Sequence, residues 1–256
     1  MTKVKWSYGV ISVTDRLNEL LPRTLESLRT GGFTAPRLFI DGSRDTGSYY
    51  NYLDKYQVTY RGERLKTFGN WVLALWELYM REPHADRYAL FEDDLVTYPH
   101  LREYLDSLEM QLNSYWNLYL HPWNHSKIIP DPESPEMGKS GFFMGKQSGY
   151  GGVALVFNRW GIEKLLSSRE LSIRPQCTTE DWWRKHDGII SNAMKIAGFT
   201  ELVHYPTLVF HTGTKSVLNG KAIQPPATTF LGEQYDARNL ISCLTLPIQS
   251  QMSAPD

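Results

Sequence analysis

The sequence predicts an α/β fold with a mostly parallel central sheet flanked by helices and a smaller C-terminal region. Apolar, β-rich runs alternate along the chain with stretches of helical periodicity. Several of these runs end abruptly in polar turns. Strands that alternate with helices are typical of parallel sheets, because each crossover returns the chain to the end at which the previous strand began.

The N-terminal half supplies three strands and two helices of this sheet. Pro22 lies near the start of the first helix, where a missing N–H is tolerated, and Gly31–Gly32 closes that helix. Pro83 ends the second helix. We therefore expect strands at 6–15, 36–45 and 87–95, and a second helix over 68–83.

The second half continues the alternation around one long loop. The stretch 124–147 is rich in Pro, Gly, Ser and Lys, which predicts a loop or flap. The remaining segments predict strands at 116–123, 149–158 and 201–211 and helices at 100–112, 159–168 and 184–199. Neither an internal repeat nor a linker divides the chain. We expect a single domain over 1–256, with halves of about 1–120 and 121–215 and a tail of about 216–256.

Composition narrows the class of protein. The chain has 256 residues, 41% of them hydrophobic, and a formal net charge of −1, so no overall basic field favours nucleic acid or membrane. Two cysteines do not form a disulfide framework. The N-terminal segment does not resemble a signal peptide, and no apolar run reaches 18 residues. We expect a cytoplasmic protein without a membrane span; the oligomeric state is not encoded in these features.

Three of the predicted strands end in acidic or polar residues. The stretches are "SVTDR" (12–16), "IDGSRD" (40–45) and "FEDDL" (91–95). Ligands of α/β sheets bind beyond the carboxyl ends of the strands, so we expect these turns to share one edge. Clustered carboxylates there would suit a hard cation such as Mg²⁺ or Mn²⁺. The simpler alternative is a solvated acidic turn.

These motifs resemble those of GT-A glycosyltransferases, which transfer a sugar from a nucleotide donor. Glu92-Asp93-Asp94 resembles their acidic metal-binding motif, and "FIDGSRD" resembles the strand end that cradles the nucleoside. Gly69-Asn70 at a helix start and "GYGGVALVF" are also similar. The resemblance covers about residues 6–215 and implies a Rossmann-like GT-A fold.

The C-terminal half adds a spacing that resembles inverting members of this family. Asp187 is followed by Gly198 and then by His211 at the end of an apolar strand. In such enzymes the acid is the catalytic base and the histidine is a metal ligand. The acid usually follows a glutamate, whereas here it follows His186, and a literal "TED" places Asp181 nearby. The helix spacing favours Asp187 over Asp181 as the base.

The resemblance implies a complete set of roles. Asp94 and His211 would bind the metal, with the imidazole favouring Mn²⁺ over Mg²⁺. The nucleotide-sugar, expected to be a UDP-sugar, would be bound by the residues at the strand ends: Thr14, Arg16 (on the donor phosphate), Asp41, Asn70, Glu92 and Asp93. Asp187, or alternatively Asp181, would accept the proton of an acceptor hydroxyl.

Two other functions remain compatible with the sequence. A nucleotidyltransferase also uses acidic strand ends and a metal, although the first turn here lacks its glycine-rich signature. A carbohydrate-binding module without catalysis would use the aromatic residues alone. The acceptor is equally open: a glycan, a small molecule, or a hydroxymethylated pyrimidine in phage DNA, which would place the protein in host cytoplasm.

Overall fold

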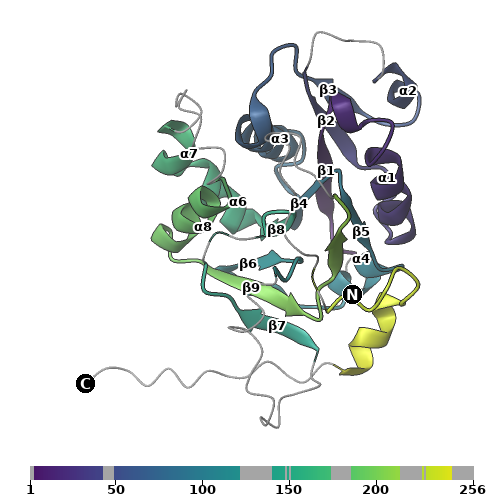
Figure 1. The fold of residues 1–256 in the computed structure, drawn as a ribbon. Helices are drawn as coiled ribbons and strands as arrows, with labels where there is room; N and C mark the ends of the chain where they lie inside the picture. The colour runs from purple at the N-terminus through teal and green to yellow at the C-terminus, as the bar shows by residue number, and fades with distance from the viewer. Residues whose placement is uncertain are drawn as a thin grey trace.

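One mixed sheet of eight strands forms the centre of the computed structural model (Figure 1). The structure describes residues 3–42, 49–121, 140–147, 149, 151–173, 186–213, 227 and 229–243. Within these residues the strand order is β3-β2-β1-β4-β8-β6-β9-β7. The strands are β1 (Trp6–Val13), β2 (Arg37–Asp41), β3 (Val58–Tyr60), β4 (Arg87–Glu92), β6 (Ser114–Asn117), β7 (Gly141–Met144), β8 (Ala154–Asn158) and β9 (Thr200–Tyr205).

The strand directions confirm the predicted mostly parallel sheet. Strands β3, β2, β1 and β4 run parallel to one another, and β6 runs parallel to β9. Strand β8 is antiparallel to both β4 and β6, and β7 is antiparallel to β9. Six of the eight strands described therefore point the same way, which is the Rossmann-like arrangement expected of a GT-A sheet.

Helices cover both faces of the sheet (Figure 1). They are α1 (Leu21–Thr30), α2 (Tyr50–Leu53), α3 (Lys66–Arg81), α4 (Leu101–Asp106), α6 (Arg159–Leu166), α7 (Arg169–Ile173) and α8 (His186–Ile196), with 3₁₀ turns η1 (Thr14–Arg16) and η4 (Ala237–Cys243). In the described part of the chain, none of these helices is long and apolar enough to cross a membrane.

The alternation of side chains along the strands creates two cores. Val10 of β1 faces the core that includes α1 and α4, whereas its neighbour Ile11 faces the core that includes α3, α6 and α8. Leu38 and Phe39 of β2 divide in the same way. Both faces of the central strands are therefore buried, which explains their nearly continuous apolar sequences.

Two predicted strands are each split, and the split builds a second sheet. The segment 87–95 is predicted as one strand, but β4 ends at Glu92 and the chain turns before β5 (Leu95–Thr97). The segment 201–211 likewise divides into β9 and β10 (Val209–His211) around Pro206, which lacks the N–H needed for a sheet ladder. Strands β5 and β10 pair antiparallel, with His211 opposite Leu95.

Other predicted boundaries also shift. The helix expected over 100–112 ends at Asp106, the strand expected over 116–123 ends at Asn117, and the strand expected from 149 begins at Ala154. No periodicity in the sequence indicates the short elements α2 and β3. Most of the predicted 124–147 loop lies outside the described residues, but its end forms β7.

His204 of β9 is fully buried between the sheet and α4. Its Nδ1 lies 2.6 Å from the carbonyl oxygen of Pro206, and its Nε2 lies 2.7 Å from the hydroxyl of Tyr104. A carbonyl only accepts, so Nδ1 carries the proton and the Tyr104 hydroxyl donates to Nε2. Burial lowers the pKa of His204 to about 4, and the imidazole is neutral in the folded protein.

We predict that this histidine makes the protein less stable in mild acid. The unfolded chain protonates His204 below its ordinary pKa of 6.5, whereas the folded chain does so only near 4. Stability should therefore fall as the pH drops from 6.5 to 4, by about 1.4 kcal/mol per pH unit from this group. Urea unfolding at pH 7 and pH 5 would show a smaller loss in His204→Gln than in the unchanged protein; an equal loss would contradict the assignment.

Candidate functional site

The predicted acidic turn lies at the carboxyl end of β4, beside the end of β1. The two strands are parallel neighbours, with Ile11 opposite Glu92. The small sheet of β5 and β10 continues from this point, and Thr212 donates its backbone N–H to the Asp94 carbonyl at 2.7 Å. The strand ends are thus brought together as the sequence predicted, and His211 arrives from a segment more than 100 residues away.

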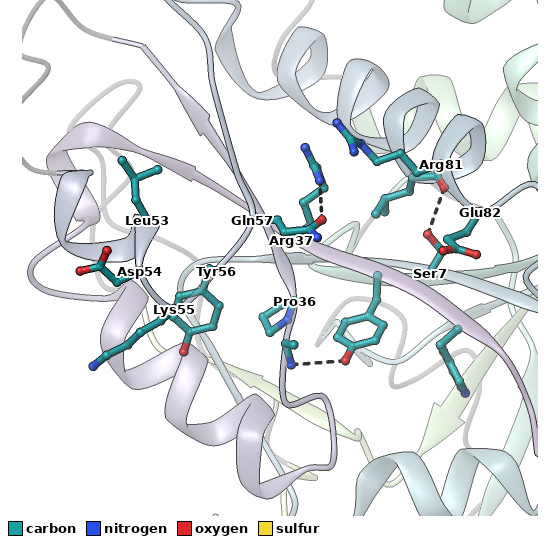
Figure 2. Close-up of a pocket in the computed structure, with 14 residues that line it drawn as sticks. Ser7, Pro36, Arg37, Leu53, Asp54, Lys55, Tyr56, Gln57, Arg81 and Glu82 are labelled. Carbon is teal, nitrogen blue, oxygen red and sulfur yellow. Dashed lines mark hydrogen bonds between the residues drawn. The ribbon is translucent and has the colours of Figure 1, made fainter.

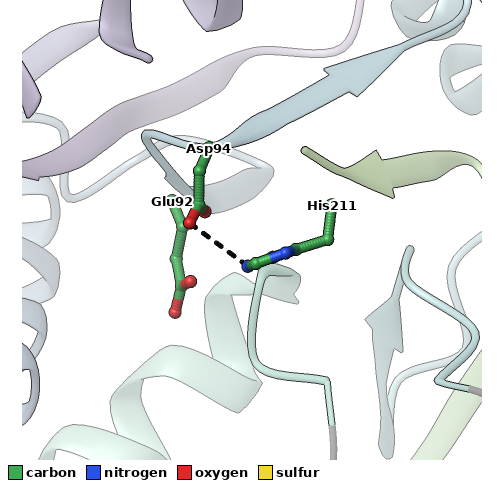
Figure 3. A group of neighbouring side chains, drawn as sticks. All are labelled: Glu92, Asp94 and His211. Carbon is green, nitrogen blue, oxygen red and sulfur yellow. Dashed lines mark ion pairs between the residues drawn. The ribbon is translucent and has the colours of Figure 1, made fainter. Parts of the chain in front are cut away.

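Glu92, Asp94 and His211 form a group that could hold a metal ion (Figure 3). One ligand atom from each lies within 4.8 Å of the others. Nε2 of His211 is 3.3 Å from Oδ2 of Asp94. Two carboxylates and one imidazole are ligands typical of Mn²⁺ and related divalent ions. The predicted pair of Asp94 and His211 therefore meets in space, with Glu92 as an additional member.

One oxygen of Asp94 tests whether a cation fits this group. The residue is 1% exposed, and its Oδ2 is already shared by His211 and Arg16. Its Oδ1 is buried without a hydrogen-bond partner. A buried carboxylate oxygen without a donor is costly. A bound cation would satisfy this oxygen, so the donor set present fits a divalent metal.

Asp93 is not a member of this group and is bound by residues of β1 and η1. Nη1 of Arg16 lies 2.8 Å from Asp93 and 2.7 Å from Asp94, and the Ser12 hydroxyl donates to Asp93 at 2.5 Å. Asp93 is 3% exposed. The Arg16 guanidinium thus contacts protein carboxylates in this structure, and its expected contact with a donor phosphate stays a prediction.

The charges of the site depend on one another. Burial and the neighbouring charge of Asp94 raise the pKa of Asp93. Burial would also raise the pKa of Asp94, but the hydrogen bond from His211 and the positive charges of His211 and Arg16 outweigh it and lower that pKa. Burial opposes protonation of His211, yet its contact with Asp94 raises the histidine pKa. Opposite charges at close range thus set these protonation states.

The side chain of Thr24 in α1 holds the acidic turn in place. The Thr24 hydroxyl lies 2.7 Å from the Asp93 carbonyl and 2.9 Å from the Leu95 carbonyl, and it also accepts the Leu95 N–H at 3.2 Å. Thr24 is fully buried. One side chain therefore satisfies the polar groups that the break between β4 and β5 leaves without a ladder partner.

Three predicted nucleotide-binding residues have other surroundings in the structure. Asp41, at the end of β2, accepts the Leu65 N–H at 2.7 Å, and burial raises its pKa. Asn70 donates to the Phe39 carbonyl at 2.9 Å from a position that is 2% exposed. Thr14 is half-buried at the start of η1. Asp41 and Asn70 join secondary-structure elements, and contact of all three with a nucleotide stays a prediction.

Asp187 lies in the first turn of α8, where its carboxylate holds a glycine-containing loop. Its Oδ2 accepts the N–H groups of Gly151 and Gly152 at 3.1 and 2.9 Å. Gly149 lies so close to the helix that an added Cβ would be 2.5 Å from the Cα of Gly188. The side chain of Asp187 is half-buried. The competing candidate, Asp181, lies outside the described residues.

His121 and Tyr119 are parts of the site that the sequence did not reveal. The Tyr119 ring centroid is 6.1 Å from that of His121 and 6.3 Å from that of His211. Burial lowers the pKa of His121, with Asp187 opposing and His211 reinforcing this shift. His121 is therefore within electrostatic reach of both Asp187 and the metal group. The only sequence signal is a histidine after an apolar run, which predicts a strand end equally well.

Comparison with known proteins does not assign this chain to a family. No profile of a known protein family matches this chain, and no curated protein matches it. Among solved structures, a mannose-1-phosphate geranyltransferase from Thermus thermophilus is similar over 78% of this chain and 74% of that chain, with 15% identity and a TM-score of 0.45. Residues 1–349 of TarS from S. aureus match 78% of this chain and 58% of that one, with 11% identity and a TM-score of 0.46.

We predict that Asp94→Asn loses metal binding while remaining folded. The amide keeps the size of the carboxylate but removes the charge that a divalent ion requires. Mn²⁺ affinity, measured by calorimetry on the protein alone, should fall by about 100-fold or more. Asp54→Asn, which changes an exposed acid elsewhere, serves as the control. Unchanged Mn²⁺ affinity in a folded Asp94→Asn protein would exclude this site.

A second prediction concerns the kind of metal. Imidazole is a better ligand for Mn²⁺ than for Mg²⁺. His211→Ala should therefore lower the affinity for Mn²⁺ by a larger factor than the affinity for Mg²⁺. Parallel calorimetric titrations with the two ions measure this difference. Equal losses would mean that His211 only supports Asp94.

Proposed function

We propose that this protein is a metal-dependent glycosyltransferase that moves a sugar from a nucleotide-sugar, with UDP-sugar as the expected donor, to an acceptor hydroxyl with inversion. The observation that carries the proposal is the meeting of Glu92, Asp94 and His211 at the carboxyl edge of the sheet. The position of Asp187 also supports the proposal. The charges of Asp187 and His211 both shift the pKa of His121, so the two residues lie near the same histidine.

The metal-binding residues would prepare the donor side of the reaction. Glu92, Asp94 and His211 would hold Mn²⁺ or Mg²⁺, which supplies Lewis-acid neutralisation of the diphosphate when bound. Arg16 keeps Asp93 and Asp94 close together and neutralises part of their charge. The acidic turn is thus preorganised, which avoids the cost of rearranging it during the reaction.

Asp187 is the proposed general base on the acceptor side. Two backbone N–H groups orient its carboxylate, and this orientation suits a group that must meet an incoming hydroxyl. The acceptor oxygen attacks the anomeric carbon, the bond from that carbon to the diphosphate oxygen breaks, and the nucleoside diphosphate leaves. The hydroxyl proton passes to Asp187. Attack from the face opposite the leaving group inverts the anomeric configuration.

The acceptor is a hydroxyl on a glycan, a small molecule or a hydroxymethylated pyrimidine in DNA. A net charge of −1 gives no general attraction to a polyanion, so DNA would need a local basic surface. The three classes are distinguished by the product of an acceptor screen, read by mass spectrometry.

Incubation with UDP-sugars and Mn²⁺ tests the proposed reaction class. A glycosyltransferase releases UDP and adds a sugar to the acceptor. A nucleotidyltransferase would instead join a nucleoside triphosphate to a sugar phosphate and release pyrophosphate from the triphosphate. A binding module would release neither UDP nor pyrophosphate. Absence of UDP from the full donor and acceptor screen would contradict the proposal.

We predict that Asp187→Asn separates catalysis from binding. Asparagine keeps an oxygen that can accept the N–H groups of Gly151 and Gly152 but cannot take the acceptor proton. Transfer should fall by roughly 10²–10⁴-fold, the usual contribution of a general base, while UDP affinity is retained. Rates of transfer and calorimetric UDP binding provide the two measurements.

The competing base is tested in the same assay. Asp181→Asn should reduce transfer far less than Asp187→Asn. The reverse order would assign the base to Asp181. A product with retained configuration, determined by NMR of the anomeric proton, would contradict inversion.

A further inference from the structure

A cavity opens at the edge of the sheet opposite the acidic turn (Figure 2). It has a volume of about 640 Å³, within the range typical of small-molecule sites. We call it the rear pocket; its lining comprises Trp6, Ser7, Tyr8, Ala35, Pro36, Arg37, Leu53, Asp54, Lys55, Tyr56, Gln57, Leu78, Arg81 and Glu82. It surrounds the start of β1, whereas the acidic turn adjoins the end of that strand, roughly 23 Å away at 3.3 Å per residue.

Arg37 is the most deeply buried charge of the rear pocket. The residue is 9% exposed, and two of its nitrogens donate to Gln57 and Thr59 at 2.7 and 3.0 Å. Its Nε is buried without a hydrogen-bond partner and lies 3.9 Å from a carboxylate oxygen of Glu77. Because this N–H lacks a hydrogen bond, the charge of Arg37 is only partly compensated inside the protein.

The protein itself supplies too little negative charge around Arg37. Glu77 is already bound by Arg61 at 2.5 Å and accepts the Thr59 hydroxyl at 2.8 Å. Arg81 is close enough to Arg37 for its positive charge to lower the Arg37 pKa, an effect second only to burial. Arg37 and Arg61 therefore share the single carboxylate of Glu77, and with Arg81 nearby the group carries an excess of two positive charges in a protein whose net charge is −1.

The other charged side chains of the lining do not cancel this excess. Glu82 forms an ion pair at 2.6 Å with Lys5, a residue that does not line the pocket. Lys55 and Asp54 are adjacent, exposed and of opposite sign. Within the described residues, the Arg81 side chain makes neither a hydrogen bond nor an ion pair. Arg81 is thus available to a ligand, and Figure 2 shows it on the same side of the pocket as Arg37.

Flat apolar surfaces complete the lining. Tyr8 and Tyr56 are half-buried and pack against the core that includes α1 and α4, whereas Arg37 stacks on Phe39 of the opposite core. The aromatic and the charged parts of the lining therefore lie on different faces of the sheet, and the arginines alone define the anion-binding part of the pocket.

We propose that the rear pocket binds a small phosphorylated molecule, with the phosphate between Arg37 and Arg81. A phosphate monoester carries a charge of about −1.5 to −2 at neutral pH, which matches the excess of two positive charges. Guanidinium groups match phosphate oxygens in geometry and bind them through charge-assisted hydrogen bonds. The site is separate from the proposed catalytic centre and does not depend on its function.

Calorimetric titration of the whole protein with phenyl phosphate tests this site. The measurement is made with EDTA and without a nucleotide, so that no metal can draw the phosphate to the acidic turn. We expect saturable binding of one molecule per chain. Arg81→Gln, which changes an exposed side chain and should fold normally, is expected to weaken binding about tenfold or more. Arg238→Gln, a change to an exposed arginine paired with Asp236, should leave it unchanged.

Two further titrations show where phenyl phosphate binds and whether its phosphate group is required. Asp94→Asn should bind phenyl phosphate as the unchanged protein does; an altered affinity would place the ion at the acidic turn and overturn the proposal. Benzoate, which has the ring but carries a single charge, should bind more weakly. Equal affinity for benzoate, equal affinity in Arg81→Gln, or no saturable binding would each overturn it.

Discussion

The candidate site depends on the contact of one guanidinium with two adjacent buried carboxylates. Arg16 reaches Asp93 and Asp94 with a single nitrogen, at 2.8 and 2.7 Å. Two carboxylates buried side by side would otherwise repel, and one would take up a proton. Because Arg16 follows β1 and the acids follow β4, the contact requires these strands to be parallel neighbours in their observed register. The central sheet and the chemistry of its edge are thus parts of one arrangement.

Because of the same contact, the three acids have different partners. Asp93 faces Arg16 and Ser12, while Glu92 and Asp94 face His211. The sharing of Oδ2 of Asp94 between Arg16 and His211 leaves its Oδ1 for a cation. A charged turn that ends an apolar strand is therefore stabilised by an internal positive charge, while one buried oxygen of Asp94 is left without a hydrogen-bond partner.

Residue patterns predict the elements of this site better than the directions of its side chains. The alternation of strands and helices, the shared edge and the pairing of Asp94 with His211 all follow from periodicity, chain order or the stated resemblance. The sequence does not predict that Glu92 joins the metal group while Asp93 binds Arg16. Side-chain directions beyond a strand end are set by tertiary partners such as Arg16. Asn70 shows the same limit: its position at a helix start is visible in the sequence, but its buried contact with the Phe39 carbonyl is not encoded locally.

The glycines before β8 complete the connection between the two halves of the site. Gly149 and Gly151 have φ values of +74° and +91°, a region that favours glycine. This conformation lets the loop approach α8 closely, and the backbone N–H groups of residues 151–152 reach Asp187. Strand β8 then runs antiparallel beside β4, the strand that carries the acidic turn. This antiparallel strand in the middle of the sheet therefore links the loop that contacts Asp187 to the strand that presents Glu92, so the start of α8 and the end of β4 are held in place by the same part of the sheet.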